Sequence, residues 1–417
     1  TGTTIVNNGT QTGFGRTGTV DWQTGSIKTG TFVPVNGEGY FVDTSSGVST
    51  ANLPAGVVGA IVSFKDYSQT FDTNALTISA NGSEKIEGQT FDLSLSTKGQ
   101  ATTLVYGDVT KGWQSVNSNE VTNQELFVTA SGGTESTSGD YKIHTFTGPG
   151  TFTVNSVGTS APNNVVDYMV IGGGGGSGGQ GGQSSGGGGA GGYRESAGTS
   201  TGSYSRSPLG ACVSALPVTA TAFPITVGAG GAGGSAGSDN NGNAGNPSVF
   251  SSITSAAGGY GGGAGCAAAG GNGGSGGGGR NSGTGGTGNT PPTSPPQGQP
   301  GGDSDGHSGS GGGGATGAGG DSNGPGGASG NGGVGATSSI NGTPTQRSGG
   351  GAGGRSPTAG ASGSNSGGGG PGVGPSGPPT TANATANTGG GAGGVGSGPL
   401  AGGVGGSGIV IIRYKFQ

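Results

Sequence analysis

Apolar and polar residues alternate through the first part of the chain with the period of two that half-buried β-strands have. Turn signals such as Asn36-Gly37 and Pro54-Ala55-Gly56 separate the alternating runs. The predicted strands span residues 39–43, 59–64, 75–79, 90–95 and 101–106. Closely spaced strands without a helical period predict an antiparallel β-sandwich or jelly roll, whose core the aromatic residue at Trp113 closes.

A second group of β-rich runs follows a polar connector at residues 115–124 and a Gly/Ser/Thr loop at 131–139. The alternating runs 141–147 and 151–154 flank Gly148-Pro149-Gly150, a pattern that predicts a β-hairpin. The remaining strands are predicted at residues 126–128, 165–171, 223–227, 248–253 and 409–414. Together these strands predict a second β-sandwich.

A glycine-rich tract separates the compact apolar strands at residues 165–171 and 409–414. Glycine makes up 113 of the 417 residues, and no aromatic residue occurs from 261 to 413. A conventional side-chain core cannot form there, because burial would not offset the backbone entropy. A disordered tail has no reason to end in a second core strand. We therefore expect an ordered insertion in a β-sandwich, with disorder as the alternative.

Glycine segments can become ordered through their backbone instead of their side chains. The polyproline II conformation is a left-handed helix with three residues per turn and no internal hydrogen bonds, so its N–H and C=O groups need outside partners. Without side chains, neighbouring rods approach closely enough to supply those partners. We predict a bundle of polyglycine II helices, with breaks such as residues 291–300 and 378–381 as the turns between rods.

The shifts in composition predict four regions along the chain. These are an N-terminal connector or arm (1–17), a β-sandwich module (18–118), a linker (119–140) and a glycine-rich β-sandwich that carries polyglycine II rods (141–417). The chain begins with Thr1 rather than Met, so we expect that an N-terminal portion is missing or has been processed. The cysteines, Cys212 and Cys266, either form one disulfide, as outside a cell, or stay unpaired in tight glycine packing.

Charge and hydrophobicity exclude several classes of partner. The net charge is -5, and a basic patch of the kind that nucleic-acid binding needs is not expected. No run of about 18 apolar residues occurs, so we expect no membrane insertion. No secretory signal is recognised.

The sequence contains little evidence of catalytic motifs. GxGxxG and GxSxG patterns arise by chance at this glycine content, and none stands between a strand and a helix. His144 and His307 are far apart, and no serine stands out as an activated nucleophile. The run 303–307 resembles the start of a calcium loop, but it lacks the glutamate at the twelfth position and is interpreted as a solvated turn. We expect no enzyme activity, no catalytic residues, no cofactor and no metal.

Aromatic and arginine residues gather in one segment of the glycine-rich region. Tyr193, Arg194, Tyr204 and Arg206 lie within 14 positions, and arginine forks beside aromatic rings are enriched at binding interfaces. These four residues are candidate contacts for a carboxylate, phosphate or saccharide ligand. The alternative is that they close the ends of glycine rods and donate hydrogen bonds to carbonyl groups there.

Several runs of the first β-region match a known module in the expected order, namely 37–45, 52–56, 74–78, 81–83, 103–106 and 112–113. By these runs the region resembles a module common in tail fibres of marine and cyanobacterial phages. The resemblance implies an elongated, often trimeric segment of a virion-attached fibre.

In the second region the matching runs are 144–147, 167–173, 226–231 and 406–414. By these runs it is similar to the glycine-rich domains at the ends of such fibres. The plan resembles the glycine-rich domain of anaplastic lymphoma kinase receptors, a sandwich of the tumour-necrosis-factor type with inserted polyglycine rods. It also resembles the distal adhesin of some T-even phages, which implies loops at the rod ends that contact the host.

These resemblances imply a non-catalytic tail-fibre or adhesin protein of the virion, extracellular, with structural and host-recognition roles. The implied partners are other copies of the chain, as a homotrimer, and a glycan or outer-membrane protein of a bacterial surface. The alternative is a subunit of an extracellular filament or appendage that polymerises by stacking or strand exchange without a specific ligand.

Overall fold

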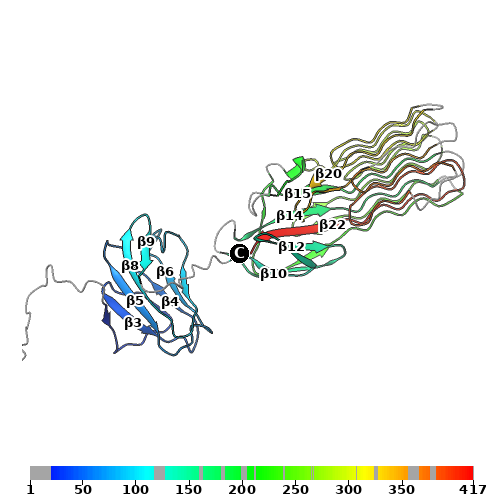
Figure 1. The fold of residues 1–417 in the computed structure, drawn as a ribbon. Coiled ribbons are helices and arrows are strands. Elements are labelled where there is room, and N and C mark those ends of the chain that lie inside the picture. Colours follow the sequence, from blue (N-terminus) through cyan, green and yellow to red (C-terminus); the bar gives the residue numbers. More distant parts are fainter. Residues whose placement is uncertain are drawn as a thin grey trace, which may run out of the picture. The chain divides into compact units, whose positions relative to one another are not determined.

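The chain divides into two compact units, residues 1–125 (unit 1) and 126–417 (unit 2), which are described separately (Figure 1). The structure is a computed structural model that describes residues 20–116, 127–158, 163–179, 184–198, 204–210, 213–237, 240–263, 265, 267–306, 308–323, 327–355, 366–375 and 382–416. The predicted arm at 1–17 lies outside the described residues, as do Cys212 and Cys266.

Unit 1 contains two β-sheets whose inward-facing residues share one core. The sheet orders are β1-β3-β5-β8-β9 and β2-β4-β6-β7. The strands are β1 (Asp21–Trp22), β2 (Thr31–Phe32), β3 (Glu38–Val42), β4 (Ser49–Asn52), β5 (Ile61–Asp66), β6 (Leu76–Ser79), β7 (Leu93–Leu95), β8 (Ala101–Asp108) and β9 (Gly112–Ser115). Tyr40 and Phe64 from one sheet and Ile78 from the other lie in the same cluster, together with the fully buried Trp113.

The prediction that unit 1 is an antiparallel sandwich is wrong for its first half. From β2 to β6 each successive strand lies in the other sheet, so the chain returns to a given sheet in its original direction. In consequence β3 pairs with β5 and β4 pairs with β6 in parallel. Antiparallel pairing begins with β6–β7 and β5–β8. The turn signals located the turns, but they carry no information on which sheet the chain enters next.

Unit 2 also contains a two-sheet core. The sheet orders are β10-β13-β17-β18-β19 and β11-β12-β22-β14-β15, with β16 also paired to β14 and β20 paired to β21. The strands are β10 (Thr129–Ser131), β11 (Thr134–Ser138), β12 (Tyr141–Phe146), β13 (Gly150–Ser156), β14 (Val165–Ile171), β15 (Tyr193–Glu195), β16 (Leu216–Pro217), β17 (Ala222–Thr226), β18 (Ser248–Phe250), β19 (Ile253–Ser255), β20 (Ala336–Ser338), β21 (Thr345–Arg347) and β22 (Ile409–Lys415). Phe152 and Phe250 from one sheet pack against Tyr168 and Tyr414 from the other.

The strands before and after the glycine tract are direct neighbours in one sheet. β14 pairs with β22 in antiparallel register, and Ile171 lies opposite Ile409. The chain therefore leaves the sheet after Ile171 and returns beside its point of departure. Every residue of β14 is buried, because residues of the insertion, including Ala315 and Ile340, cover the second face of the sheet.

The predicted hairpin over residues 141–154 is wrong. β12 pairs with β11 and β22, whereas β13 pairs with β10 and β17, so the Gly-Pro-Gly turn carries the chain from one sheet to the other. The alternation was correct on both sides of the turn, because Phe146 and Phe152 enter the same core from opposite sheets. The region predicted as the loop 131–139, within the predicted linker, contains the polar strand β11.

A bundle of helices with internal hydrogen bonds is not seen in the described residues of the glycine tract. Within the described residues the one helical element is the short 3-10 helix η1 (Pro208–Gly210). The glycine segments run side by side instead, as Figure 1 shows for the part of unit 2 beyond the sheets. Hydrogen bonds between their backbones join them into a network, which we call the glycine lattice.

The segment from Ser185 to Gly192 illustrates how the lattice is connected. Each of its eight consecutive N–H groups donates to a carbonyl of a neighbouring segment, at N···O distances between 2.7 and 3.0 Å. Consecutive residues donate to three different segments in turn, so every third N–H group donates to the same segment. The acceptor segments are 389–395, 256–262 and 310–313, and its own carbonyls accept from residues 172–175, 275–278 and 351–354.

Glycine is required inside the lattice because neighbouring carbonyl groups occupy the space of a side chain. A Cβ atom at Gly173 would lie 2.1 Å from the carbonyl oxygen of Ala229, and one at Gly176 would lie 2.1 Å from that of Ala232. Such contacts are far below van der Waals distance. The run of glycines after β14 is therefore set by packing as well as by backbone freedom.

Candidate functional site

Tyr193, the first candidate binding residue, lies in β15 beside the sheet–lattice junction. It is 1% exposed and packs in the cluster that contains Ile171, Ile409 and Ile340. Its O–H donates to Oε2 of Glu195 at 3.0 Å. Burial and the neighbouring Glu195 raise the pKa of the Tyr193 phenol well above its usual value. A side chain in this position supports the fold and is not accessible to a ligand.

Glu195 is the centre of a buried polar group that holds residues 204–207 against β15. Its Oε2 also accepts hydrogen bonds from the backbone N–H of Ser207 at 3.0 Å and from the Ser207 hydroxyl at 2.5 Å. Burial raises the pKa of the Glu195 carboxyl. The guanidinium of Arg347, itself 6% exposed, interacts electrostatically with Glu195 and Tyr193. This group was not predicted from the sequence, since Arg347 is far from Glu195 along the chain.

Tyr204 and Arg206 are held by the junction but are more accessible than Tyr193. Tyr204 is half-buried, and its O–H donates to the carbonyl oxygen of Ser196 at 3.3 Å. Arg206 is exposed, and its Nη1 donates to the carbonyl oxygen of Ala197 at 3.2 Å. Arg194, in the middle of β15, is half-buried. The contact of Arg206 with a carbonyl group agrees with the alternative that the arginines donate hydrogen bonds to free carbonyls. Because Arg206 is also exposed, a contact between its guanidinium and a ligand stays a prediction.

A second buried pair of charged residues lies beside this segment, on the paired strands β14 and β22. Asp167 lies opposite Arg413 in the register, and its Oδ1 accepts from the Ser196 hydroxyl at 2.6 Å. The Arg413 guanidinium stacks over Tyr141 and Tyr204, at 4.5 and 5.6 Å from their ring centres. These contacts tie the loop after β15 to the central strands.

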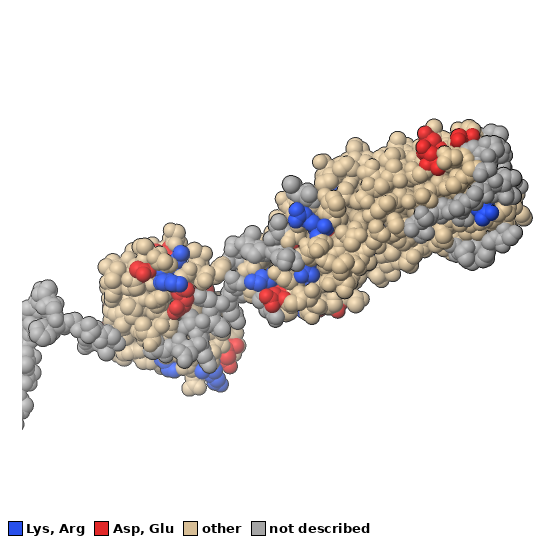
Figure 2. Space-filling view, turned by 45° about the horizontal axis from the view of Figure 1, so that its top comes forward, with Lys and Arg blue, Asp and Glu red and all other residues tan. Residues whose placement is uncertain are grey.

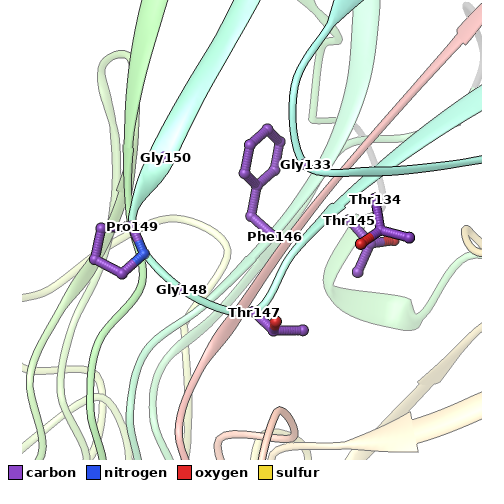
Figure 3. A pocket seen from close by; sticks show the side chains of 8 residues that line it. All are labelled: Gly133, Thr134, Thr145, Phe146, Thr147, Gly148, Pro149 and Gly150. Atoms are coloured by element: carbon purple, nitrogen blue, oxygen red, sulfur yellow. The ribbon is translucent and has the colours of Figure 1, made fainter.

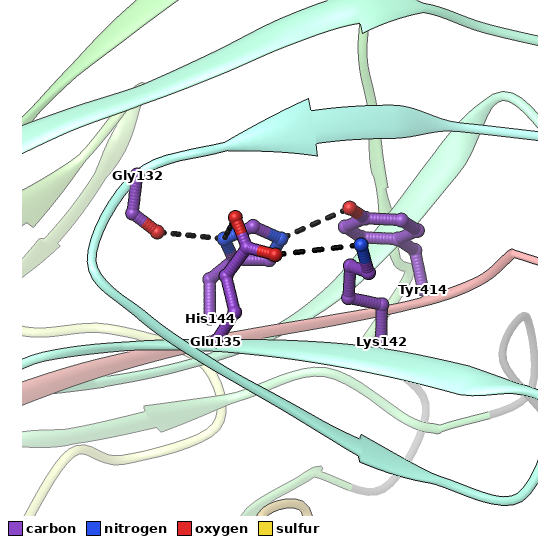
Figure 4. Close-up of polar contacts among 5 residues, drawn as sticks. All are labelled: Gly132, Glu135, Lys142, His144 and Tyr414. Atoms are coloured by element: carbon purple, nitrogen blue, oxygen red, sulfur yellow. Dashed lines mark hydrogen bonds and ion pairs between the residues drawn. The ribbon is translucent and has the colours of Figure 1, made fainter.

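The His144 ring packs against Phe152 and Tyr414 in the core of unit 2, and Figure 4 shows its polar contacts. Its Nδ1 is 2.7 Å from the carbonyl oxygen of Gly132, and its Nε2 is 2.9 Å from the hydroxyl of Tyr414. A neutral ring that donates from Nδ1 and accepts at Nε2 satisfies both contacts. Burial lowers the pKa of the imidazole, although the Gly132 bond and Glu135 act in the opposite direction. These contacts indicate a structural histidine.

A shallow hollow opens beside Phe146, at the turn between β12 and β13 (Figure 3). Its volume is about 220 Å³, and threonines contribute much of its lining. The lining residues are Gly133, Thr134, Thr145, Phe146, Thr147, Gly148, Pro149 and Gly150. The hollow contains no titratable group, so acid–base chemistry has no basis there.

Among the described residues of the insertion, the exposed acidic side chains lie at the end of the lattice away from the sheets, as Figure 2 shows for one face. Asp303, Asp305 and Asp321 are exposed. Oδ1 of Asp321 accepts from the N–H of Asp303, and Oδ1 of Asp303 accepts from the N–H of Gly285, both at 2.7 Å. Arg280 in turn donates to the carbonyl of Gly263. These side chains satisfy backbone groups where segments end.

A hollow of about 370 Å³ lies at the same end of the lattice. It is lined by Gly233, Gly234, Ser235, Asn240, Asn241, Gly242 and Asn243. Its lining consists of glycines and small polar residues, and these residue types provide no catalytic group.

The described part of the chain contains no group of three His, Cys, Asp or Glu side chains that could hold a metal ion. His307, the other histidine of the sequence, lies outside that part. Across the same residues, no helix has the length and apolar character needed to cross a membrane.

The comparison with known families agrees with the composition and covers most of unit 2. A family described as the glycine-rich domain matches residues 147–415. The match begins after β12 and includes both flanking strands, β14 and β22, with the lattice between them. None of the curated proteins matches the chain.

Proposed function

The chain belongs to the family of glycine-rich domains, and from that premise we propose that it is a non-catalytic tail-fibre or adhesin protein that recognises a bacterial surface. The observation that carries this proposal is the backbone connection of the lattice. Inner segments such as Ser185–Gly192 are held by amide hydrogen bonds to several neighbours, so their packing does not depend on side chains. A framework of this kind holds the residues at its end in place while their identity varies.

The lattice itself is proposed to consist of polyglycine II helices inserted in a sandwich of the tumour-necrosis-factor type. Every third N–H group of Ser185–Gly192 donates to the same neighbouring segment. This three-residue repeat supports the proposal, because the polyglycine II conformation has three residues per turn. In such a bundle each rod has several neighbours. The partners of Ser185–Gly192 on all sides are in keeping with that arrangement.

The recognition surface is proposed to be the end of the lattice away from the sheets. Asp303, Asp305 and Asp321 are exposed there, and small polar residues line the hollow beside Ser235 and Asn240. Arg194 and Arg206, near the sheets, form the second candidate surface. In a virion fibre made of three copies, weak contacts at each tip would combine into strong attachment.

Binding to immobilised bacterial lipopolysaccharides and capsular polysaccharides tests the proposal. The far-end variant is Asp303→Asn/Asp305→Asn/Asp321→Asn, and the arginine variant is Arg194→Ala/Arg206→Ala. A matched control, Asp72→Asn/Asp92→Asn/Asp108→Asn, makes the same change of charge on exposed residues of unit 1. We expect the far-end variant to lose affinity by about tenfold or more, and the control to keep it.

Other outcomes separate the alternatives. Loss of affinity only in the arginine variant would move recognition to the segment beside β15. If the chain bound none of these surfaces and formed open helical filaments in electron micrographs, the adhesin proposal would be overturned in favour of a filament subunit.

A further inference from the structure

The outer segments of the lattice have unpaired backbone groups on their solvent side. Residues 228–236 form one such segment. On its inner side the N–H groups of Gly231 and Gly234 donate to the carbonyls of Gly174 and Ser177. Among the described residues, no hydrogen bond is made by the N–H groups of Ala229, Gly230, Ala232 and Gly233. Such an edge corresponds to the open edge of a β-sheet, which can pair with another chain.

The same segment carries a side chain toward solvent once every three residues. Ala229, Ala232 and Ser235 are exposed, whereas Gly231 and Gly234 between them are buried. Two other outer segments repeat the pattern with Asn240, Asn243 and Asn246, and with Ala328, Asn331 and Val334, all exposed. Inner segments do not: Gly172–Gly176, Gly186–Gly189 and Gly349–Gly351 are pure glycine and buried.

Inside the lattice, a Cβ atom and a neighbouring segment exclude each other. At the inner glycines Gly173, Gly176 and Gly179, an added Cβ would lie 2.1 to 2.2 Å from a carbonyl oxygen of segment 228–236. A real Cβ that projects outward from Ala229 or Ala232 therefore occupies the place where the next segment would dock. Hydrogen bonds to one neighbouring segment recur every three residues. Side chains at the same spacing therefore place a Cβ atom beside each position where a further segment would bond.

We infer that the outward side chains at Ala229, Ala232 and Ser235 close a surface that would otherwise pair with the glycine segments of a second copy of this chain. The hydrogen-bonding groups of the edge indicate a second copy of this chain as the partner. The edge offers N–H donors at a three-residue spacing, without charge, and a glycine segment offers carbonyls at the same spacing. Copies in a fibre or filament are thus kept from joining through this edge of their lattices, and assembly uses other surfaces.

Removal of the obstruction tests the inference. The variant Ala229→Gly/Ala232→Gly/Ser235→Gly should associate beyond the wild-type assembly as concentration rises, measured by sedimentation velocity. The control Ala229→Ser/Ala232→Ser/Ser235→Ala keeps every Cβ and should sediment like the wild type. A glycine variant that unfolds at the wild-type temperature yet keeps the wild-type mass at every concentration would overturn the inference.

Residue-resolved amide exchange of the wild type keeps the test decisive if the glycine variant does not fold. We expect rapid exchange at Ala229, Gly230, Ala232 and Gly233 and strong protection at Gly231 and Gly234. Equal protection at all six amides would mean that the edge is already covered, which contradicts the inference. Neither result depends on the ligand, so a failure here is distinct from a failure of the adhesin proposal.

Discussion

The effect of replacing a glycine in this protein depends on which atoms lie where a Cβ would be placed. Gly176 lies inside the lattice, where a Cβ would be 2.1 Å from the carbonyl oxygen of Ala232, whereas Gly374 has nothing within 4 Å of that position. The two residues look identical in the sequence. Their difference comes from partners that are distant along the chain.

The substitution Gly176→Ala should therefore lower the free energy of unfolding by about 1–3 kcal/mol, the usual effect of forcing extra atoms into a packed interior. The matched control Gly374→Ala should leave stability unchanged or raise it by up to about 1 kcal/mol, because alanine restricts the unfolded chain. Thermal unfolding of both variants measures this. Equal effects would show that the lattice is not close-packed at Gly176.

His144 predicts a pH dependence of folding. Its pKa is lowered in the folded protein, so the unfolded state binds the proton more readily. The stability is fully present above the unfolded pKa of about 6.5 and falls as the pH drops toward the folded value, by up to about 1.4 kcal/mol per pH unit. Denaturant unfolding between pH 7 and pH 5 measures the loss.

The other histidine of the sequence provides the control for this experiment. His307→Asn should show the same loss of stability as the wild type. If the wild-type stability were flat across this pH range, or if His307→Asn removed the dependence, the assignment to His144 would be wrong.

At the scale of elements, the sequence predicted β14 and β22 well because both are short, apolar and bounded by glycine. Their pairing explains why the glycine tract ends as it does. Partner choice was harder to predict. The turn after β12 and the parallel pairs of unit 1 depend on which sheet the chain enters, and turn residues do not encode this. The polar strand β11 was missed because all its residues are hydrophilic and it lies at a sheet edge.

The segment that contains Tyr193 and Arg206 combines two roles that the sequence could not separate. Their closeness in the sequence grouped the aromatic and arginine residues, but burial distinguishes them: Tyr193 is in the core and Arg206 is exposed. Glu195, which organises the segment, was not predicted, because its charged partner Arg347 is distant in the sequence and its partner Ser207 is one of many serines in this region.

The substitution Tyr193→Phe should destabilise the fold without changing ligand contacts. It removes one donor from the buried Glu195 carboxyl, which costs about 1–3 kcal/mol when an acceptor loses its partner. Arg206→Ala, on the exposed side, should change stability by no more than about 0.5 kcal/mol. Chemical denaturation of the two variants compares them. The assignment fails if Arg206→Ala is the more destabilising change.

At the scale of the whole molecule, each unit has its own hydrophobic core. The core of unit 1 is made from residues 40–113, and the clusters of unit 2 lie within residues 128–414. A fragment of residues 126–417 should therefore fold without unit 1 and unfold within about 2 °C of the corresponding transition in the full chain. Calorimetry tests this, and a fragment that does not unfold cooperatively would show that the units depend on each other.

The central claim is that backbone hydrogen bonds between segments, rather than side chains, order the glycine tract. Residue-resolved amide hydrogen exchange across Ser185–Gly192 tests it most directly. The network predicts strong protection at all eight consecutive amides, because each donates to another segment. Protection of alternate amides would indicate an edge strand, and rapid exchange throughout would indicate disorder. Either result would contradict the account.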